Sequence, residues 1–430
     1  MIESILGFAA FLALAFLRVP LSIAMGLVGF IGFAIQVNLN ASLAMVGQVV
    51  YETGLAYTLS VIPLFILMGN LIVQSKLAEE IYRAAYAFIG HRPGGLAMST
   101  IVACGGFGSI CGSALATTAT FCKIAAPSMT KFNYQPHLIA GTIATGGTLG
   151  ILIPPSLILV LYGIMTDENI GRLFVAGIVP GILAVLFLCG AVLFIVTRNP
   201  AAGPKGNREN WDTRLRSLRR IWAVIVLFVV ILGGIYAGVF TATEGAGIGA
   251  FGALLFAIFL GNLTFRELVD VLVQTATATA VLFMILIGAL IFANFVNLTT
   301  MPRDLVSFIQ AANMPAGVVV LMICAIYILL GTAMEELSMI ALTVPLFYPI
   351  VTEVGYSGIW FGVAVVIVCQ IGLTTPPIGI NIFVVKSMMD GLSIRDAFRG
   401  TWPFNAALVL LLLLLIAVPD IATFLVQYMR

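Results

Sequence analysis

Long apolar runs separated by short polar stretches dominate the chain. Two charged, amphipathic stretches, 76–92 and 302–313, predict helices that lie at a membrane surface. The apolar runs predict helices, most of them near the 18 or so residues that crossing a bilayer requires. These runs cover residues 2–17, 20–37, 55–75, 172–196, 221–239, 243–262, 268–297 and 402–428. The pattern predicts an all-α polytopic membrane protein.

Two further apolar regions, 93–130 and 315–352, are interrupted near their middles by small and polar residues. In the first region the interruption runs from Cys104 to Ser113, and in the second from Gly331 to Ser338. Each half is about 15 residues, or roughly 22 Å of helix, which is shorter than a hydrocarbon core of ~30 Å. Each region is therefore predicted to form a re-entrant helical hairpin rather than one kinked span.

Prolines interrupt two other apolar runs, 135–163 and 357–388. Each contains the pattern Gly-x-x-x-Pro-Pro, from Gly150 to Pro155 and from Gly372 to Pro377. Proline lacks the N–H that a helix needs, and its ring clashes with the preceding turn. Within lipid, broken backbone is tolerated only where it is buried in protein or lines a cavity. Both runs are thus predicted to be discontinuous helices with free carbonyl groups near mid-membrane.

The two halves of the chain repeat one another at an offset of 222 residues. Gly150-x-x-x-Pro-Pro corresponds to Gly372-x-x-x-Pro-Pro, and helix-breaking residues elsewhere follow the same offset, among them Pro93 with Pro315 and Pro127 with Pro349. Paired broken segments in corresponding halves are typical of a secondary transporter whose site lies where the repeats meet. The sequence leaves open whether the repeats are inverted.

Composition agrees with a membrane protein and argues against an enzyme. The chain is 61% hydrophobic and 9% charged, whereas soluble domains have roughly 25% charged residues. The six cysteines form no Cys-x-x-Cys pair, and the two histidines lie far apart, so neither metal nor Ser-His-Asp chemistry is expected. A net charge of +2 gives no indication of nucleic-acid binding. The first residues lack a positive n-region, so we expect a first span rather than a removable signal.

The first hairpin tip and the first break together offer a set of oxygen atoms. Hard cations prefer oxygen ligands, so the hydroxyl groups and carbonyl groups of these segments predict a sodium site. Small residues at such positions can instead serve only close helix packing. The candidate ligands are Ser109, Gly112, Ser113, Gly150, Ile153 and Pro155.

The second half offers an equivalent set, and so a second sodium site. Glu335 and Glu336 are costly at membrane depth and then functional, although a tip that reaches water would solvate both. An anionic substrate would lie between the sites, against half-helix N-termini. The second sodium site comprises Gly331, Thr332, Glu335, Gly372, Thr375 and Pro377, and the expected substrate-proximal residues are Ser113, Thr148, Pro154, Thr374 and Pro376.

Four motifs resemble the large membrane subunit of tripartite ATP-independent periplasmic (TRAP) transporters. They are Gly146 to Ser156 followed by Tyr162-Gly163, Gly171 to Gly181, Gly233 to Glu244, and Thr374 to Gly379. The resemblance covers essentially the whole chain and departs at Cys111 and Ala242, where the family usually has serine and proline.

The resemblance implies sodium-coupled import of an organic acid, such as a C4-dicarboxylate or sialic acid, with at least two Na⁺ ions and an elevator movement. It implies a small four-helix membrane subunit and a periplasmic substrate-binding protein as partners, in a bacterial inner membrane. A stand-alone sodium/anion symporter of similar architecture remains the alternative.

The elevator hypothesis divides the chain into moving and fixed parts. Residues 93–163 and 315–390 would move, each a hairpin plus a broken helix, against scaffold helices in 1–75 and 221–297. The remaining segments are the arms 76–92 and 302–313, a spanning helix at 170–197, a cytoplasmic linker at 198–220 by the positive-inside rule, and a C-terminal helix at 400–430.

Overall fold

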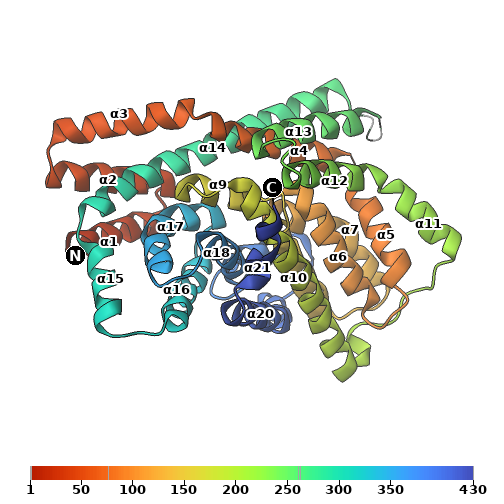
Figure 1. Cartoon of the computed structure of the whole chain (residues 1–430). Helices are drawn as coiled ribbons and strands as arrows, with labels where there is room; N and C mark the ends of the chain where they lie inside the picture. The colour runs from red at the N-terminus through yellow and green to blue at the C-terminus, as the bar shows by residue number, and fades with distance from the viewer. Residues whose placement is uncertain (1, 76, 260, 262, 430) are drawn as a thin grey trace.

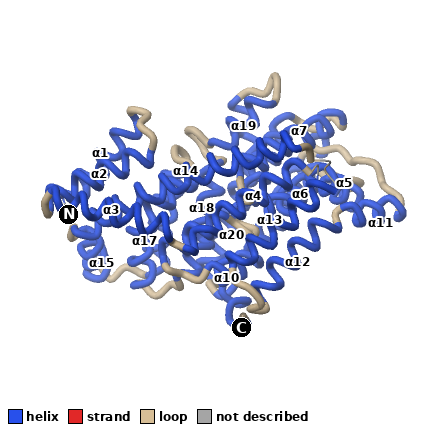
Figure 2. The backbone as a smooth tube through the Cα atoms, turned by 90° about the horizontal axis from the view of Figure 1, so that it is seen from above, coloured by secondary structure: helices blue, strands red, loops and turns tan. Residues whose placement is uncertain are grey.

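The computed structural model describes residues 2–75, 77–259, 261 and 263–429. Three residues at the bounds of predicted segments lie outside the described residues. Lys76 begins the first predicted arm, Met1 begins the first predicted segment, and Arg430 ends the last one. All regular elements in the described chain are helices, and Figure 2 shows no strand there. Six described helices are long and apolar enough to cross a membrane. The predicted class, an all-α polytopic membrane protein, is confirmed.

The helices that precede the arm in each half, expected to form the scaffold, pack across one another. The first half contributes α1 (Ile2–Phe16), α2 (Leu21–Gln36), α3 (Leu39–Leu55), η1 (Tyr57–Ser60) and α4 (Val61–Gln74), and the second contributes α12 (Trp222–Tyr236), α13 (Ala242–Phe259) and α14 (Phe265–Leu298). Helix α2 packs along α14, and α4 along α13. A Cβ at Gly29 would lie 2.7 Å from the backbone of Ile291, so glycine permits this close approach of two backbones.

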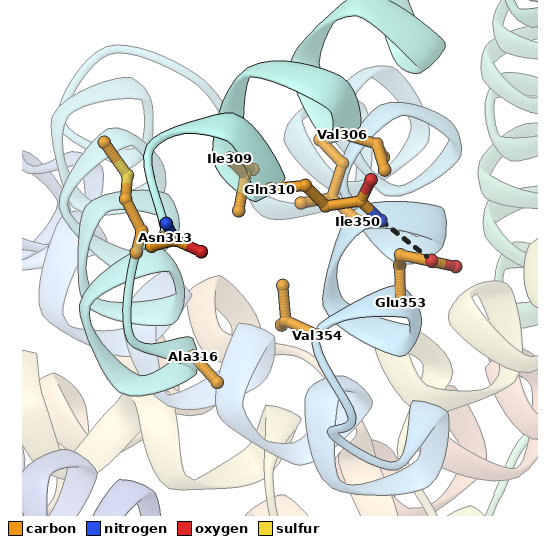
Figure 3. Close-up of a pocket in the computed structure, with 9 residues that line it drawn as sticks. Val306, Ile309, Gln310, Asn313, Ala316, Ile350, Glu353 and Val354 are labelled. Carbon is orange, nitrogen blue, oxygen red and sulfur yellow. Dashed lines mark hydrogen bonds between the residues drawn. The ribbon is translucent and has the colours of Figure 1, made fainter.

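Two short amphipathic helices, α5 (Leu77–Ile89) and α15 (Met301–Ala311), lie at opposite ends of the molecule (Figure 1). The two helices occupy most of the amphipathic stretches 76–92 and 302–313, whose role as arms stays a prediction. Helix α15 contacts α17, where Gln310 Nε2 donates a hydrogen bond to Glu353 Oε1 at 3.2 Å. This hydrogen bond borders a pocket of about 430 Å³ between the two helices (Figure 3).

Each of the two interrupted apolar regions, 93–130 and 315–352, forms two helices joined by a tight turn. The first pair is α6 (Gly95–Cys111) with α7 (Ala114–Lys131), and the second is α16 (Ala316–Gly331) with α17 (Glu336–Glu353). Gly112 turns the first pair with a φ of 65°, a conformation that favours glycine. The Ser113 hydroxyl then caps α7 by accepting a hydrogen bond from the N–H of Ala116 at 3.3 Å.

Both proline-containing runs are broken helices. The first comprises α8 (Pro136–Gly147), η2 (Thr148–Ile151) and α9 (Leu157–Thr166), and the second α18 (Gly358–Leu373) and α19 (Ile380–Met388). Both Pro-Pro peptide bonds are cis. The second halves pack reciprocally, because α9 contacts α17 of the other hairpin and α19 contacts α7. Figure 2 shows α19 beside α7.

Two segments differ from the sequence prediction. The linker at 198–220 is not a polar loop throughout, because it contains η3 (Pro200–Ala202) and α11 (Trp211–Arg220) after the long span α10 (Ile170–Arg198). The C-terminal segment is not one helix to residue 428. Helix α20 (Ile394–Ala417) ends before Val418, which is disfavoured in helical geometry because a proline follows it, and the short α21 (Asp420–Thr423) and η4 (Phe424–Tyr428) come next.

Candidate ion and substrate site

The first hairpin lies directly against the first break. A Cβ at Gly108 would lie 2.5 Å from the Cα of Gly150, and one at Gly150 would lie 2.9 Å from the Cα of Gly108. A Cβ at Gly112, in the hairpin turn, would lie 3.5 Å from the side chain of Leu157, where α9 begins. The hairpin therefore touches both sides of the break, with Gly108, the neighbour of Ser109, against Gly150 and with Gly112 against Leu157.

The second hairpin makes the equivalent contact with the second break. A Cβ at Gly372 would lie 2.8 Å from the Cα of Gly331, and one at Gly331 would lie 3.2 Å from the Cα of Gly372. The backbone N–H of Gly379, just before α19, donates to the carbonyl oxygen of Thr332 at 3.2 Å. Three residues of the second predicted group, Gly331, Thr332 and Gly372, thus lie together.

Around the first break, some oxygen atoms form hydrogen bonds and others have no partner among the described residues. The hydroxyl of Ser156 donates to the carbonyl oxygen of Ile151 at 2.5 Å, and the hydroxyl of Ser109 to that of Gly106 at 2.8 Å. By contrast, the carbonyl groups of Ile153, Pro154 and Pro155 accept no hydrogen bond from the described residues. Unpaired buried carbonyl groups are uncommon, so these oxygens are suited to a bound cation.

Helix α20 holds the second break through two polar side chains. The carbonyl oxygen of Thr374 accepts hydrogen bonds from Thr401 Oγ1 and Asn405 Nδ2, both at 3.1 Å. The hydroxyl of Thr374 donates to Asn405 Oδ1 at 2.6 Å, and Asn405 Nδ2 also donates to Thr375 Oγ1 at 3.1 Å. Sequence reasoning missed Thr401 and Asn405, although an asparagine within an apolar span was an available signal.

Glycines, not polar groups, bring α10 against the first break. A Cβ at Gly177 would lie 2.9 Å from the carbonyl oxygen of Leu152, and one at Gly181 would lie 2.8 Å from the side chain of Ile153. Pro154 and Pro155 are buried, whereas Pro376 and Pro377 are exposed. The two breaks therefore share backbone geometry but differ in their surroundings.

Buried amides join the two broken helices. Gln370 Nε2 donates to the carbonyl oxygen of Thr148 at 2.9 Å, and Asn381 Nδ2 donates to that of Ala144 at 3.1 Å. Gln370 and Asn381 are fully buried, and their amide oxygens have no partner among the described residues. Sequence reasoning missed both residues, although their polar side chains stand in otherwise apolar helices.

Unpartnered hydroxyl groups lie on the same helices. Thr117 and Thr118 on α7 and Thr142 and Thr145 on α8 are fully buried, and their hydroxyls have no partner within the described chain. Helix α19, which carries Asn381, packs against both α7 and α8. Buried polar groups normally have a partner, so this region can accept an ion, water or a polar substrate. The spacing of three between Thr142, Thr145 and Thr148 was the available signal.

The two acidic residues of the second hairpin turn differ in their surroundings. Glu335 Oε2 accepts a hydrogen bond from the hydroxyl of Ser338 at 3.3 Å. Glu336 is 5% exposed, and its Oε2 has no partner among the described residues. No hydrogen bond in the described chain joins Glu335 to the segment from Gly372 to Pro377, so its place in the second sodium site stays a prediction.

Two broken helices that meet between two helix hairpins, inside a frame of spanning helices, define a polytopic membrane transport protein. The chain matches the family model described as "Tripartite ATP-independent periplasmic transporter, DctM component" over residues 8–421. It therefore belongs to the TRAP transporter large permease family, whose members are multi-pass proteins of the bacterial inner membrane and are named transporters rather than enzymes.

Two relatives agree with this assignment, and a solved structure shares the fold. The chain is 34% identical over 375 residues to the C4-dicarboxylate TRAP transporter large permease protein DctM of Pseudomonas aeruginosa, covering 86% of this chain and 87% of that protein. It is 31% identical over 370 residues to the sialic acid TRAP transporter large permease protein SiaM of Vibrio cholerae, covering 85% of each. The Alcanivorax borkumensis YdaH transporter shares the fold, with a TM-score of 0.54 and 14% identity over 87% of this chain and 86% of that one.

Proposed function

We propose that the chain is the permease subunit of a sodium-coupled importer of an organic acid. The observation that carries this proposal is the pair of glycine contacts, Gly108 with Gly150 and Gly331 with Gly372. In each half, these contacts bring a hairpin backbone within reach of an unwound helix, and in the first half the carbonyl groups from Ile153 to Pro155 accept no hydrogen bond from the described residues. A hard cation needs several oxygens that converge without large side chains between them.

These contacts support two proposed sodium sites. The first would use Ser109, Gly112, Ser113, Gly150, Ile153 and Pro155, and the second Gly331, Thr332, Glu335, Gly372, Thr375 and Pro377. The free carbonyl groups from Ile153 to Pro155 favour the first site, and the hydrogen bond from Gly379 to Thr332 favours a compact second site. At least two Na⁺ ions would be carried with each substrate.

The substrate would lie between the two sites. Helices α9 and α19 begin directly after the breaks, and helix N-termini favour carboxylate groups. The P. aeruginosa and V. cholerae relatives are named for C4-dicarboxylates and sialic acid, which are carboxylates. The residues nearest the substrate would be Ser113, Thr148, Pro154, Thr374 and Pro376, with Thr374 acting through its position because its hydroxyl and carbonyl groups are already engaged.

An elevator movement would carry the substrate. The parts 93–163 and 315–390 would move together against the crossed scaffold pairs α2 with α14 and α4 with α13. The arms α5 and α15 would link moving and fixed parts. A periplasmic binding protein would deliver the substrate, and a small four-helix membrane subunit would complete the permease.

The driving force depends on the charge of the substrate. A tenfold sodium gradient supplies ~1.4 kcal/mol per ion, and 100 mV supplies about 2.3 kcal/mol per net charge moved. Two sodium ions with a dianion would move no net charge, so only the gradient would drive import. Two sodium ions with a monoanion would also use the membrane potential once.

Uptake by the reconstituted complex tests the proposal. Proteoliposomes that contain this chain and its small subunit should accumulate a carboxylate when sodium and the binding protein are both present outside. Uptake that persists without sodium would refute the ion sites. Sodium-dependent uptake by this chain alone, without a binding protein, would instead support the stand-alone symporter.

A further inference from the structure

A buried arginine on the linker helix α11 lacks an acceptor for part of its side chain. Arg214 is 7% exposed, and its Nε donates to the carbonyl oxygen of Ala87 at 3.0 Å. Its guanidinium lies 4.9 Å from the ring centre of Trp211 and 5.8 Å from that of Phe88. Its Nη2 is buried and has no partner among the described residues. A buried charged donor without an acceptor is costly, so an anion would stabilise this position.

Other basic groups surround the same position. Partial burial, and then the guanidinium groups of Arg214, Arg208 and Arg92, hold the pKa of His91 below its usual range. None of these three arginines forms an ion pair within the part of the chain that the structure describes. The corner between α5 and α11 thus gathers three arginines, none of which is in ion-pair contact with a carboxylate among the described residues.

An apolar groove of about 560 Å³ begins at this corner. Phe88, which lies beside the Arg214 guanidinium, and Leu218, one turn after Arg214 on α11, both line the groove. The groove continues between α5, α6, α10 and α12, where Val102, Ile182 and Ile225 line it. Hydrocarbon is the matching occupant, because burying CH₂ groups against an apolar lining is favourable.

Helix α11 has the features of a helix that lies in the membrane interface. It is bent by 52° from the following helix α12. Its apolar side chains Trp211 and Leu215 are 68% and 57% exposed, while arginines cover much of its remaining surface. Amphipathic basic helices of this kind lie in the headgroup region, and the positive-inside rule places this one on the cytoplasmic side.

We propose that this corner binds one anionic phospholipid, with its phosphate at Arg214 and an acyl chain in the groove. The charge at the mouth of the groove is complementary to a phosphate, and guanidinium groups bind phosphate through directed hydrogen bonds. A transmembrane helix about 10 Å wide and 30 Å long fills on the order of 2,400 Å³. The groove is much smaller, so it cannot enclose a partner helix but can take an acyl chain.

Native mass spectrometry of the purified full-length chain tests the site. Dioleoyl phosphatidylglycerol should bind at least about tenfold more tightly than dioleoyl phosphatidylcholine, and Arg214→Gln should abolish most of that preference. Arg219→Gln is the matched control, since it removes the same charge from an exposed position on the same helix. Ile182→Trp should weaken phosphatidylglycerol binding by filling the groove while leaving the arginines in place.

Several outcomes would overturn the proposal. An equal loss in Arg219→Gln and Arg214→Gln would show general surface charge, and full competition by inorganic phosphate would show a free anion site. Unchanged binding in Ile182→Trp would exclude the acyl chain from the groove. If Arg214→Gln does not fold, Arg214→Lys takes its place, because lysine keeps the charge but loses the forked donors of arginine. Phosphatidylglycerol binding that is retained in both Arg214→Lys and Ile182→Trp would then refute the site.

Discussion

Gly108→Ala tests whether contact between hairpin and break forms the first sodium site. The added Cβ would lie 2.5 Å from the Cα of Gly150. This neighbour is a backbone atom, so no side chain can rotate away to relieve the clash. Restoring ordinary van der Waals contact at about 3.4 Å would separate hairpin and break by about 0.9 Å.

That separation is large for a hard cation, because oxygen ligands to such ions lie within a range of only about 0.3 Å. Overpacking of this kind costs roughly 1–3 kcal/mol. If the cost falls on the sodium-bound state, the sodium concentration for half-maximal uptake should rise about tenfold, since each ~1.4 kcal/mol changes an equilibrium tenfold.

The assay is sodium-dependent uptake by the reconstituted complex, with thermal stability measured in parallel. Gly331→Ala is a milder test in the second half, because its Cβ would lie 3.2 Å from the Cα of Gly372. It should shift the sodium dependence by no more than about threefold. Gly190→Ala is the control, since no described atom outside its own stretch of helix backbone lies within 4 Å of the position of its Cβ.

Normal uptake with unchanged sodium dependence in Gly108→Ala would refute this reasoning. An equal loss in Gly108→Ala and Gly190→Ala would also refute it, because only the first substitution meets the opposing backbone. A folded Gly108→Ala protein that binds substrate but needs more sodium would match the expected result.

Three further predictions concern side chains around the breaks and the arms. Asn405→Ala removes partners of Thr374 at a cost of about 1–3 kcal/mol. Asn405→Ala should lower the melting temperature by a few degrees and reduce uptake. Unchanged values of both would contradict the inference that α20 stabilises the second break. Ser113→Ala and Thr375→Ala should each raise the sodium concentration for half-maximal uptake severalfold. Sodium titration curves identical to that of the unmodified protein in both variants would show that these residues serve only in packing. Glu353→Ala removes an exposed hydrogen bond from Gln310, so uptake should stay within about twofold; a large loss would show that the arm contact is functionally required.

The helix breaks could be predicted from sequence because their cause is local. Proline lacks the N–H of a helix and disfavours helical geometry in the residue before it, so Gly150 to Pro155 and Gly372 to Pro377 could not continue as regular helices. The contacts between hairpins and breaks could be predicted for a similar reason. Gly331 and Gly372 lie where two backbones meet, and glycine allows that close approach.

The support of the second break could not be predicted, because it depends on residues distant in sequence. Thr401 and Asn405 lie on α20, 27 and 31 residues from Thr374, and nothing local indicates which helix face meets the break. The extra helix α11 was missed because its arginines resemble a polar loop. Its periodicity becomes meaningful only once Arg214 is seen buried against Phe88 and Ala87.

The hydrogen bond between Gln370 and Thr148 bears on which parts of the molecule can move together. The two residues are separated by 222 positions, which is the repeat offset itself, so each is the counterpart of the other. Counterparts in contact must lie close to the axis that relates the two halves. Pulling the broken helices apart would leave the buried amide of Gln370 and the carbonyl of Thr148 unpaired, at about 1–3 kcal/mol for each group. The second hydrogen bond, from Asn381 to Ala144, opposes the same separation. In the proposed elevator, both broken helices should therefore travel as one body, and sliding should occur where the hairpins meet the scaffold.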